Sequence, residues 1–463
     1  MKLKMSVILS AGLLLVCLST RYLAVQAQPV PSAATEFVLK NGMKVIVRED
    51  HRAPTVVQMV WYKVGSIDES NGTTGVAHAL EHMMFKGTRK HKAGEFSRLV
   101  AELGGRENAF TNRDYTAYFQ QVEQSRLEAV MALEADRMRN VQFDRHEFAK
   151  EIRVIMEERR WRTDDQPQGL MSEALNAAAF VAHPYHHPVI GWMDDLQHMT
   201  VQDTEAWYRR WYTPNNATLV VSGNVSADKV AVLAQKYFGR IPAKTIMHGK
   251  PQNEPEQRGL RRVTVKAPAE NPYVILAFKA PSLRDLEKDQ DVYALGILSA
   301  VLDGYDNARL NDRLVRTGKV ANSVGAGYDN MTRGPSLFTL EGSPTAGITT
   351  TQLENLLRAE VARIAEEGIS EQELQRVKTQ LIASQIYKRD SIFGQAMEIG
   401  LLEMSGLSHK NIDRIIDRLK AVTPQQVQAV AQKYFSDDKL TVATLEPLPL
   451  SGRKPGPPPG PLR

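Results

Sequence analysis

A pattern that occurs twice, 223 residues apart, restricts this chain to a duplicated architecture. Thr200 and Thr423 each precede a helix-compatible segment that ends in two aromatic residues, and Thr218 and Thr441 each lie in the strand-like run that follows. The offset is the same for both pairs of threonines and is about the length of one domain. Duplication of a whole α+β unit therefore explains the pattern better than a solenoid of short repeats does.

The composition along the chain divides it into five segments. A Pro-, Lys-, Gln- and Glu-rich stretch near the middle is typical of a linker, and the last residues are rich in Pro and Gly. We predict the α+β class, with each domain a mostly antiparallel sheet packed by helices. The predicted segments are a signal peptide (1–27), an N-terminal domain (34–245), a linker (246–261), a C-terminal domain (262–447) and a disordered tail (448–463).

The first 27 residues have the features of a secretory signal. Lys2 and Lys4 form a basic start, and the apolar run that follows, Met5–Leu18, is too short to span a bilayer comfortably. Cys17 is the only cysteine, and its neighbours are poor for lipid attachment, so the mature protein would have no disulfide. We expect a periplasmic or secreted protein with no membrane span.

The positive net charge lies outside the predicted domains. The formal charge is +5 and the isoelectric point is about 9.0, which would suit a nucleic-acid-binding protein. Six basic residues lie in the predicted signal and tail: Lys2, Lys4, Arg21, Arg453, Lys454 and Arg463. Removing these six charges from +5 leaves −1 for the folded body, so we expect no nucleic-acid partner.

The segment Gly75–Gly87 places two imidazoles and a carboxylate within five positions. His78 and His82 are four residues apart, so a helix would place both on one face, where they could bind one metal ion. Glu81 lies beside them and could act as a base. This HxxEH order is typical of the inverted zinc peptidases. The alternative is an ordinary helix with two surface histidines, and the pentapeptide alone does not decide between the two.

A third ligand is predicted in a helix over residues 147–161. Its apolar stripe includes Val154 and Ile155, and Glu151 and Glu158 fall on the same stripe. A buried carboxylate is costly unless it is paired or bound to metal. Either this helix is mostly exposed or Glu158 meets a cation, and with the two histidines present we favour the second interpretation.

The HALEH sequence, followed after 76 residues by the second Glu of Val154-Ile-Met-Glu-Glu158, resembles the pitrilysin family of zinc peptidases, in its bacterial branch similar to the mitochondrial processing peptidase. The resemblance implies one Zn²⁺ ion on His78, His82 and Glu158, with Glu81 as catalytic base. It also implies that Glu151 orients a ligand. The expected activity is hydrolysis of unfolded peptides or small proteins in a chamber enclosed by the two domains.

The residues after the predicted zinc site suggest where a peptide would bind. The segment 107–120 is predicted to be an edge strand. In the family that strand receives the substrate as an added β-strand, which implies backbone contacts at Asn108, Ala109 and Phe110. A sheet strand with no role in binding is the alternative for each of these residues.

The second unit lacks the HxxEH motif and also lacks two residues that active relatives usually carry there. The resemblance places Val315 where an Arg is expected and Asn322 where a Tyr is expected; Arg316 is one residue out of register. It thus implies a homologous non-catalytic partner that carries the Arg–Tyr pair, or else a homodimer. The alternative function is that of a structural or binding subunit that keeps a zinc site, as in respiratory-complex core proteins of the same superfamily.

Overall fold

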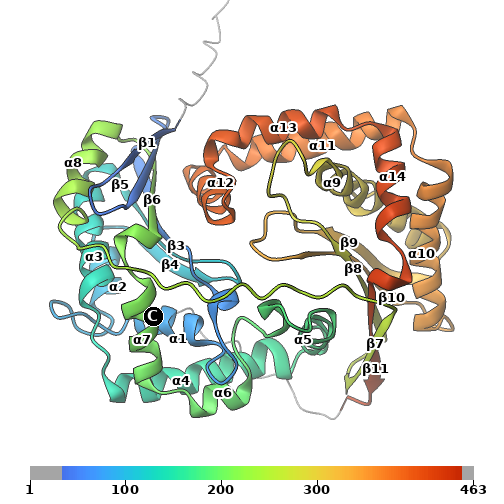
Figure 1. Cartoon of the computed structure of the whole chain (residues 1–463), viewed down its shortest axis with the longest axis horizontal. Coiled ribbons are helices and arrows are strands. Elements are labelled where there is room, and N and C mark those ends of the chain that lie inside the picture. Colours follow the sequence, from blue (N-terminus) through green and yellow to red (C-terminus); the bar gives the residue numbers. More distant parts are fainter. Residues whose placement is uncertain (1–33, 451–463) are drawn as a thin grey trace, which may run out of the picture.

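The computed structural model describes residues 34–450, which form two β-sheets with helices packed around them (Figure 1). The predicted signal peptide lies outside the described residues, as does nearly all of the predicted tail. Within 34–450, no helix combines the length and the apolar character needed to cross a membrane. The predicted α+β class is confirmed.

The first sheet contains six strands, whose bounds are β1 (Thr35–Val38), β2 (Lys44–Glu49), β3 (Thr55–Tyr62), β4 (Arg106–Thr111), β5 (Thr116–Glu123) and β6 (Ala217–Gly223). Their order is β1-β2-β6-β3-β5-β4, and all pairs are antiparallel except β2–β6. The helices of this half are α1 (Val76–Met83), α2 (Glu95–Glu102), α3 (Leu127–Asn140), α4 (Arg145–Arg159), α5 (Pro167–Ala179), α6 (Met193–His198), α7 (Val201–Trp211) and α8 (Ala227–Tyr237).

The second sheet contains five strands, whose bounds are β7 (Arg261–Pro268), β8 (Tyr273–Ala280), β9 (Ala321–Tyr328), β10 (Ser336–Pro344) and β11 (Leu440–Leu448). Their order is β7-β11-β8-β10-β9, and only β7–β11 is parallel. The helices are α9 (Gln290–Asp303), α10 (Thr350–Glu367), α11 (Glu371–Lys388), α12 (Ile392–Ser405), α13 (Ile412–Ala421) and α14 (Pro424–Tyr434).

The edge strand is shorter than the sequence suggested. Residues 107–120 were predicted as one strand, but they form a hairpin of β4 and β5, and only β4 lies at the sheet edge. Asn112, Arg113 and Asp114 form the turn, and the N–H of Asn112 donates to the carbonyl of Tyr115. Asn and Asp favour turns because their side chains bond to nearby backbone groups. On the free side of β4, no described strand is paired with it.

The two halves contain the predicted repeat. Thr200 and Thr423 both cap a helix, α7 and α14, and each makes a capping box with the residue three positions later. A short 3₁₀ turn and then a strand follow in each copy, ending in β6 and β11. The repeated sequence pattern therefore corresponds to a repeated structural unit.

Each sheet is covered on one face by a helix from the other half. Helix α5 belongs to the first half but packs on β7, β8 and β11, where Met171 and Leu175 join Ile275 in one apolar cluster. Helix α12 belongs to the second half but packs on β3 and β6. Its Gly400 lies so close to Trp61 of β3 that a Cβ would be 2.0 Å from the indole. The halves therefore share apolar cores that neither half completes alone.

Residues 242–260 connect the two halves and run between them as an extended segment, here called the strap (Figure 1). Its Glu254 accepts hydrogen bonds from three successive N–H groups, those of Val181, Ala182 and His183, at about 3.0 Å each. The Nζ of Lys279 lies 3.5 Å from the same carboxylate. These contacts to both halves fix the path of the strap.

Gly400→Ala is expected to lower the free energy of unfolding by about 1–3 kcal/mol, because a methyl group would overpack against Trp61. Gly296→Ala is the matched control. Gly296 also lies inside a helix, α9, but nothing lies within 4 Å of its Cβ position, so the change should stabilise the protein by roughly 0.5–1 kcal/mol. Denaturant unfolding of both variants measures the difference. Equal effects of the two changes would show that Trp61 does not resist the added methyl group.

Candidate metal centre

Helix α1 carries the predicted histidines, and its start is fixed by a buried carboxylate. Glu69 accepts hydrogen bonds from the N–H groups of Gly75 (2.9 Å) and Ala77 (2.8 Å). Gly75 has a φ of 86° and packs against the carbonyl of Ile190, which leaves no room for a side chain. All residues of α1 are buried, so its polar side chains point into the protein rather than into solvent.

The structure brings His78, His82 and Glu158 together. The Oε2 atom of Glu158 lies 3.6 Å from Nε2 of His78 and 3.5 Å from Nε2 of His82. One ligand atom from each residue lies within 4.8 Å of the other two. The Nε2 of His82 is buried, and within residues 34–450 it has no hydrogen-bond partner. A buried nitrogen with no partner is costly, and a metal ion at this position would remove that cost.

Glu151 lies behind His82, where it was expected to orient a ligand. Its Oε2 is 3.2 Å from Nδ1 of His82, and its Oε1 is 2.8 Å from Nζ of Lys86. A carboxylate in this position accepts the Nδ1–H and keeps the lone pair of Nε2 available. Lys86, which no sequence pattern indicated, stabilises the charged form of Glu151.

Glu81 lies beside this cluster and is 3% exposed. Its Oε2 accepts a hydrogen bond of 2.5 Å from Oγ1 of Thr111, the last residue of β4. Burial raises the pKa of Glu81, although the bond from Thr111 opposes the shift. The edge strand and the candidate base are thus in direct contact.

The burial pattern of α4 differs from the predicted stripe at one position. Glu151, Ile155 and Glu158 are buried as expected, but Val154 is 41% exposed. The three buried residues follow the i, i+4, i+7 spacing of one helix face, and Val154 lies at the margin of that face. The prediction that Val154 belongs to the buried stripe is therefore wrong, while the inward direction of both carboxylates is confirmed.

The electrostatic environment differs between the two histidines. Burial and the nearby His82 together lower the pKa of His78 to about 3, against the opposing effect of Glu158. Burial also opposes the charged form of His82, but the carboxylates of Glu151 and Glu158 outweigh it and raise the pKa of His82 to about 9. The carboxylates therefore favour a positive charge at this point in the site.

A second group of His and Glu side chains differs from the α1 cluster in how its charges are balanced. Glu36, Glu403 and His409 also lie within 4.8 Å of one another. However, the Nζ of Lys44 is 2.6 Å from Glu403, and the Nζ of Lys410 is 2.9 Å from Glu36. Lysines already neutralise this group, and Nδ1 of His409, the ring nitrogen that contacts its carboxylates, bonds to Glu403 at 2.8 Å. Nε2 of His409 is also buried without a partner among residues 34–450, but in the α1 cluster the unpartnered nitrogen is the one that lies 3.5 Å from a carboxylate oxygen. The donor set of His78, His82 and Glu158 fits zinc, which two imidazoles and a carboxylate commonly bind.

The second half has no Arg–Tyr pair at the expected positions. Val315 packs against the apolar core, and the side chain of Asn322 donates to the carbonyl of Pro344. Arg316 donates to the side chain of Asn307, and the hydroxyl of Tyr328 donates to the carbonyl of Pro281. All four side chains are thus engaged by their own half.

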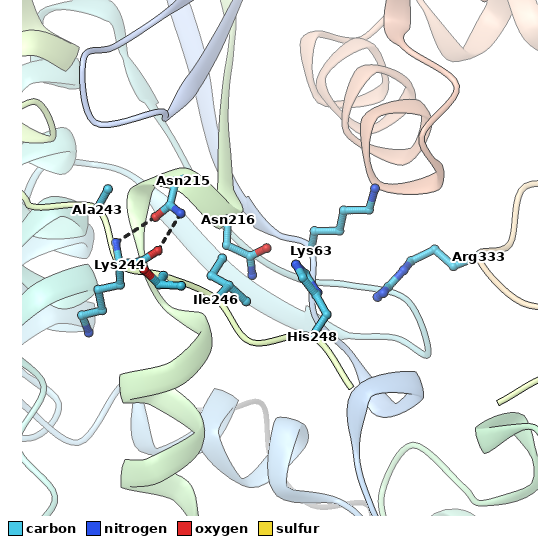
Figure 2. Close-up of a pocket in the computed structure, with 9 residues that line it drawn as sticks. Lys63, Asn215, Asn216, Ala243, Lys244, Ile246, His248 and Arg333 are labelled. Carbon is cyan, nitrogen blue, oxygen red and sulfur yellow. Dashed lines mark hydrogen bonds between the residues drawn. The ribbon is translucent and has the colours of Figure 1, made fainter. Parts of the chain in front are cut away.

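A pocket of about 720 Å³ between the two halves contains none of the predicted site residues (Figure 2). Lys63 and Asn216 come from the first half, Arg333 from the second, and His248 from the strap. Arg333 is already paired with Asp68, at 2.8 and 3.1 Å. The lining residues include one histidine, His248, and no carboxylate, so this pocket does not offer a second set of metal ligands like that on α1 and α4.

Comparisons with known proteins show the family to which the chain belongs. Residues 44–191 match the family model described as insulinase (peptidase family M16), and residues 198–381 match the model described as the peptidase M16 inactive domain. The zinc protease PqqE of Helicobacter pylori is 31% identical over 443 residues, which cover 94% of this chain and 98% of that protein. The chain belongs to peptidase family M16.

Two other similar proteins extend the comparison. The uncharacterized zinc protease YmxG of Bacillus subtilis is 28% identical over 405 residues, covering 87% of this chain and 96% of the relative. The crystal structure of a protease from Helicobacter pylori superimposes with a TM-score of 0.86 at 29% identity, covering 90% of this chain and all of that one. This M16 chain is therefore similar to proteins named zinc proteases along nearly its whole length.

Three contacts of the candidate metal centre were not found from the sequence: Thr111 to Glu81, Lys86 to Glu151 and Arg162 to Glu158. Helical spacing contained a signal for one of them, because Arg162 lies four residues after Glu158. Lys86 follows the end of α1, and Thr111 lies on a strand, so only tertiary structure reveals their contacts.

Proposed function

We propose that this M16 chain is a zinc-dependent endopeptidase that hydrolyses unfolded peptides or small proteins. The observation that carries the proposal is the buried Nε2 of His82, which has no hydrogen-bond partner among the described residues and lies 3.5 Å from a carboxylate oxygen of Glu158. His78, His82 and Glu158 would hold one zinc ion.

Each side chain of the centre has a chemical task in this proposal. The bound zinc ion supplies a Lewis acid beside the scissile carbonyl. Glu81 takes a proton from the attacking water and gives it to the leaving amine. Thr111 holds the carboxylate of Glu81 in place, and Glu151 keeps the proton of His82 on Nδ1, away from the metal.

The substrate would bind along β4. This strand has a free edge in the described chain, and it ends at Thr111, which contacts the base. The N–H of Ala109 donates to the side chain of Asn108, and a peptide strand would take over that N–H. The ring of Phe110 packs against Trp61 with 5.5 Å between centroids, which anchors the strand from behind.

Assembly is the second part of the proposal. We infer that the chain is the zinc-bearing subunit of a heterodimer of the mitochondrial-processing-peptidase-like branch, and that a homologous subunit supplies the Arg–Tyr pair that Val315 and Asn322 replace. The domains 34–245 and 262–447 would form walls of the chamber. A homodimer is the alternative. The signal peptide over 1–27 would direct the chain to the periplasm or out of the cell.

A non-catalytic structural or binding subunit is the second candidate function. The match of residues 198–381 to a model described as an inactive domain favours it for the second half. The first half argues against it, because a relict site would not need a buried base beside two imidazoles and two inward carboxylates.

The purified mature chain is expected to contain about one zinc ion and to cleave quenched unstructured peptides, and a chelator should abolish cleavage until zinc is restored. If zinc is present and cleavage is weak, mixing with the homologous subunit from the same cell should raise the rate. A chain that binds zinc but stays inactive in the mixture would support the structural function instead. Chelation removes the Lewis acid, so cleavage that persists in excess chelator would contradict the proposal.

A further inference from the structure

The helix that carries Glu158 does not end as an ordinary α-helix. After α4, residues Arg160–Asp164 form a π-helical turn, a rare feature that is frequent at functional sites. The Nη1 atom of Arg162 in this turn lies 2.8 Å from Oε1 of Glu158. The other carboxylate oxygen, Oε2, is the one that faces the two imidazoles.

We propose that Arg162 is a positioning residue of the metal centre: its guanidinium holds Oε1 of Glu158, so that Oε2 points between His78 and His82. The inference rests on the proposed function, because it assigns Glu158 as a metal ligand. Arg162 is assigned this role through its contact with Glu158 and not as a metal ligand.

The backbone of Arg162 is fixed well enough for this role. A Cβ on Gly169, near the start of α5, would lie 2.6 Å from the carbonyl oxygen of Arg162, so only glycine lets α5 pack against the π-helical turn. The preceding Arg159 is buried and bonds to Glu173 at 2.7 and 3.0 Å and to the carbonyl of Gly191 at 2.9 Å. Helical side chains lean toward the N-terminus, which directs Arg162 back onto Glu158.

The same turn contains a matched control. Arg160 is 44% exposed and pairs with Glu157, a solvent-facing residue that has no contact with the centre. Arg162 is 60% exposed, but its partner Glu158 is 8% exposed and faces the imidazoles. Arg160 donates a hydrogen bond to Glu157, whereas Arg162 forms an ion pair with Glu158 at 2.8 Å, so the two arginines differ in the carboxylate they contact and in the kind of contact.

Two effects of Arg162 on zinc affinity have opposite signs. Its positive charge repels a cation, so a purely electrostatic role predicts that its removal strengthens zinc binding. If Arg162 orients Glu158, removal of its guanidinium should weaken zinc binding, because the freed carboxylate can move away from the two imidazoles. The carboxylates of Glu81, Glu151 and Glu158 surround the site, and Lys86 offsets the charge of Glu151 alone among these three. Because this negative charge counters the repulsion between Arg162 and a zinc ion, we expect the orientation effect to determine the change in zinc affinity.

The test is zinc affinity, measured by competition with a chelating dye on the mature full-length chain. We expect Arg162→Met to weaken zinc binding about 10–100-fold, the range for partners of metal ligands. Arg162→Lys, which keeps a donor on a flexible stem, should fall between this variant and the native chain. Arg160→Met should bind zinc as the native chain does. Equal or tighter binding by Arg162→Met would overturn the inference.

His82→Ala separates this inference from the proposed function. If His82→Ala loses zinc and Arg162→Met does not, only the role of Arg162 fails. If the native chain binds no zinc, or His82→Ala binds it unchanged, the metal centre itself is wrong. Thermal unfolding in chelator shows whether each variant is folded. Arg162→Met should lower the midpoint and still unfold cooperatively, because the change removes the arginine paired with Glu158, which is 8% exposed.

Discussion

Glu81→Gln should abolish peptide hydrolysis and leave zinc binding close to that of the native chain. The amide has nearly the same shape as the carboxylate and its oxygen can still accept the hydrogen bond from Thr111. It cannot take a proton from water. Loss of general-base catalysis costs roughly 10²–10⁴-fold in rate, so turnover of a quenched peptide should fall to the lower limit of a standard assay.

Glu102→Gln is the control for that change. Glu102 is exposed at the end of α2 and pairs with Arg98, so its replacement should affect neither zinc nor turnover. Zinc content, kcat and KM are measured for both variants. Because Glu81 is assigned to the chemical step, kcat should fall while KM changes little. A zinc-loaded Glu81→Gln variant that keeps appreciable turnover would assign the base to another residue.

His82→Ala is expected to weaken zinc binding more than about 100-fold, beyond the 10–100-fold typical of residues that only support a ligand. The change removes a ligand nitrogen and leaves Glu151 paired with Lys86 alone. The remaining His78 and Glu158 are too few for a stable zinc site in a protein. Cleavage should be lost at the same zinc concentrations.

His198→Ala is the corresponding control, because His198 is exposed at the end of α6 and its imidazole bonds to Asp194, one turn earlier on the same helix. Zinc affinity is compared by the same dye competition, and high added zinc should restore part of the cleavage by His82→Ala. Zinc binding that is the same in His82→Ala as in His198→Ala would remove His82 from the ligand set.

The positions of site residues that share a helix face could be predicted from the sequence. The spacing of His78 and His82 required only that α1 be a helix, and the inward direction of Glu151 and Glu158 followed from the apolar pattern of α4. The contact between Thr111 and Glu81 joins residues 30 positions apart across a strand and a helix. No local pattern contains that information, because it depends on how β4 packs against α1.

The fold shows the same division between local and non-local information. The capped helices after Thr200 and Thr423 were predictable because a capping box is a local pattern. The turn at Asn112–Asp114 was a local signal that the prediction of one long strand overlooked. The packing of α5 and α12 on the sheets of the opposite halves was not predictable. The apolar face of an amphipathic helix does not specify which sheet the helix will pack on.

The placement of α5 and α12 bears on how the duplicated chain has been able to change. Once each copy supplies a helix to the other, neither can be deleted without exposing the apolar face of its twin. The second copy must then be kept even though it lacks the zinc motif. Val315 and Asn322 suit this supporting role, because Val315 packs against the apolar core of the second copy and Asn322 bonds to the carbonyl of Pro344.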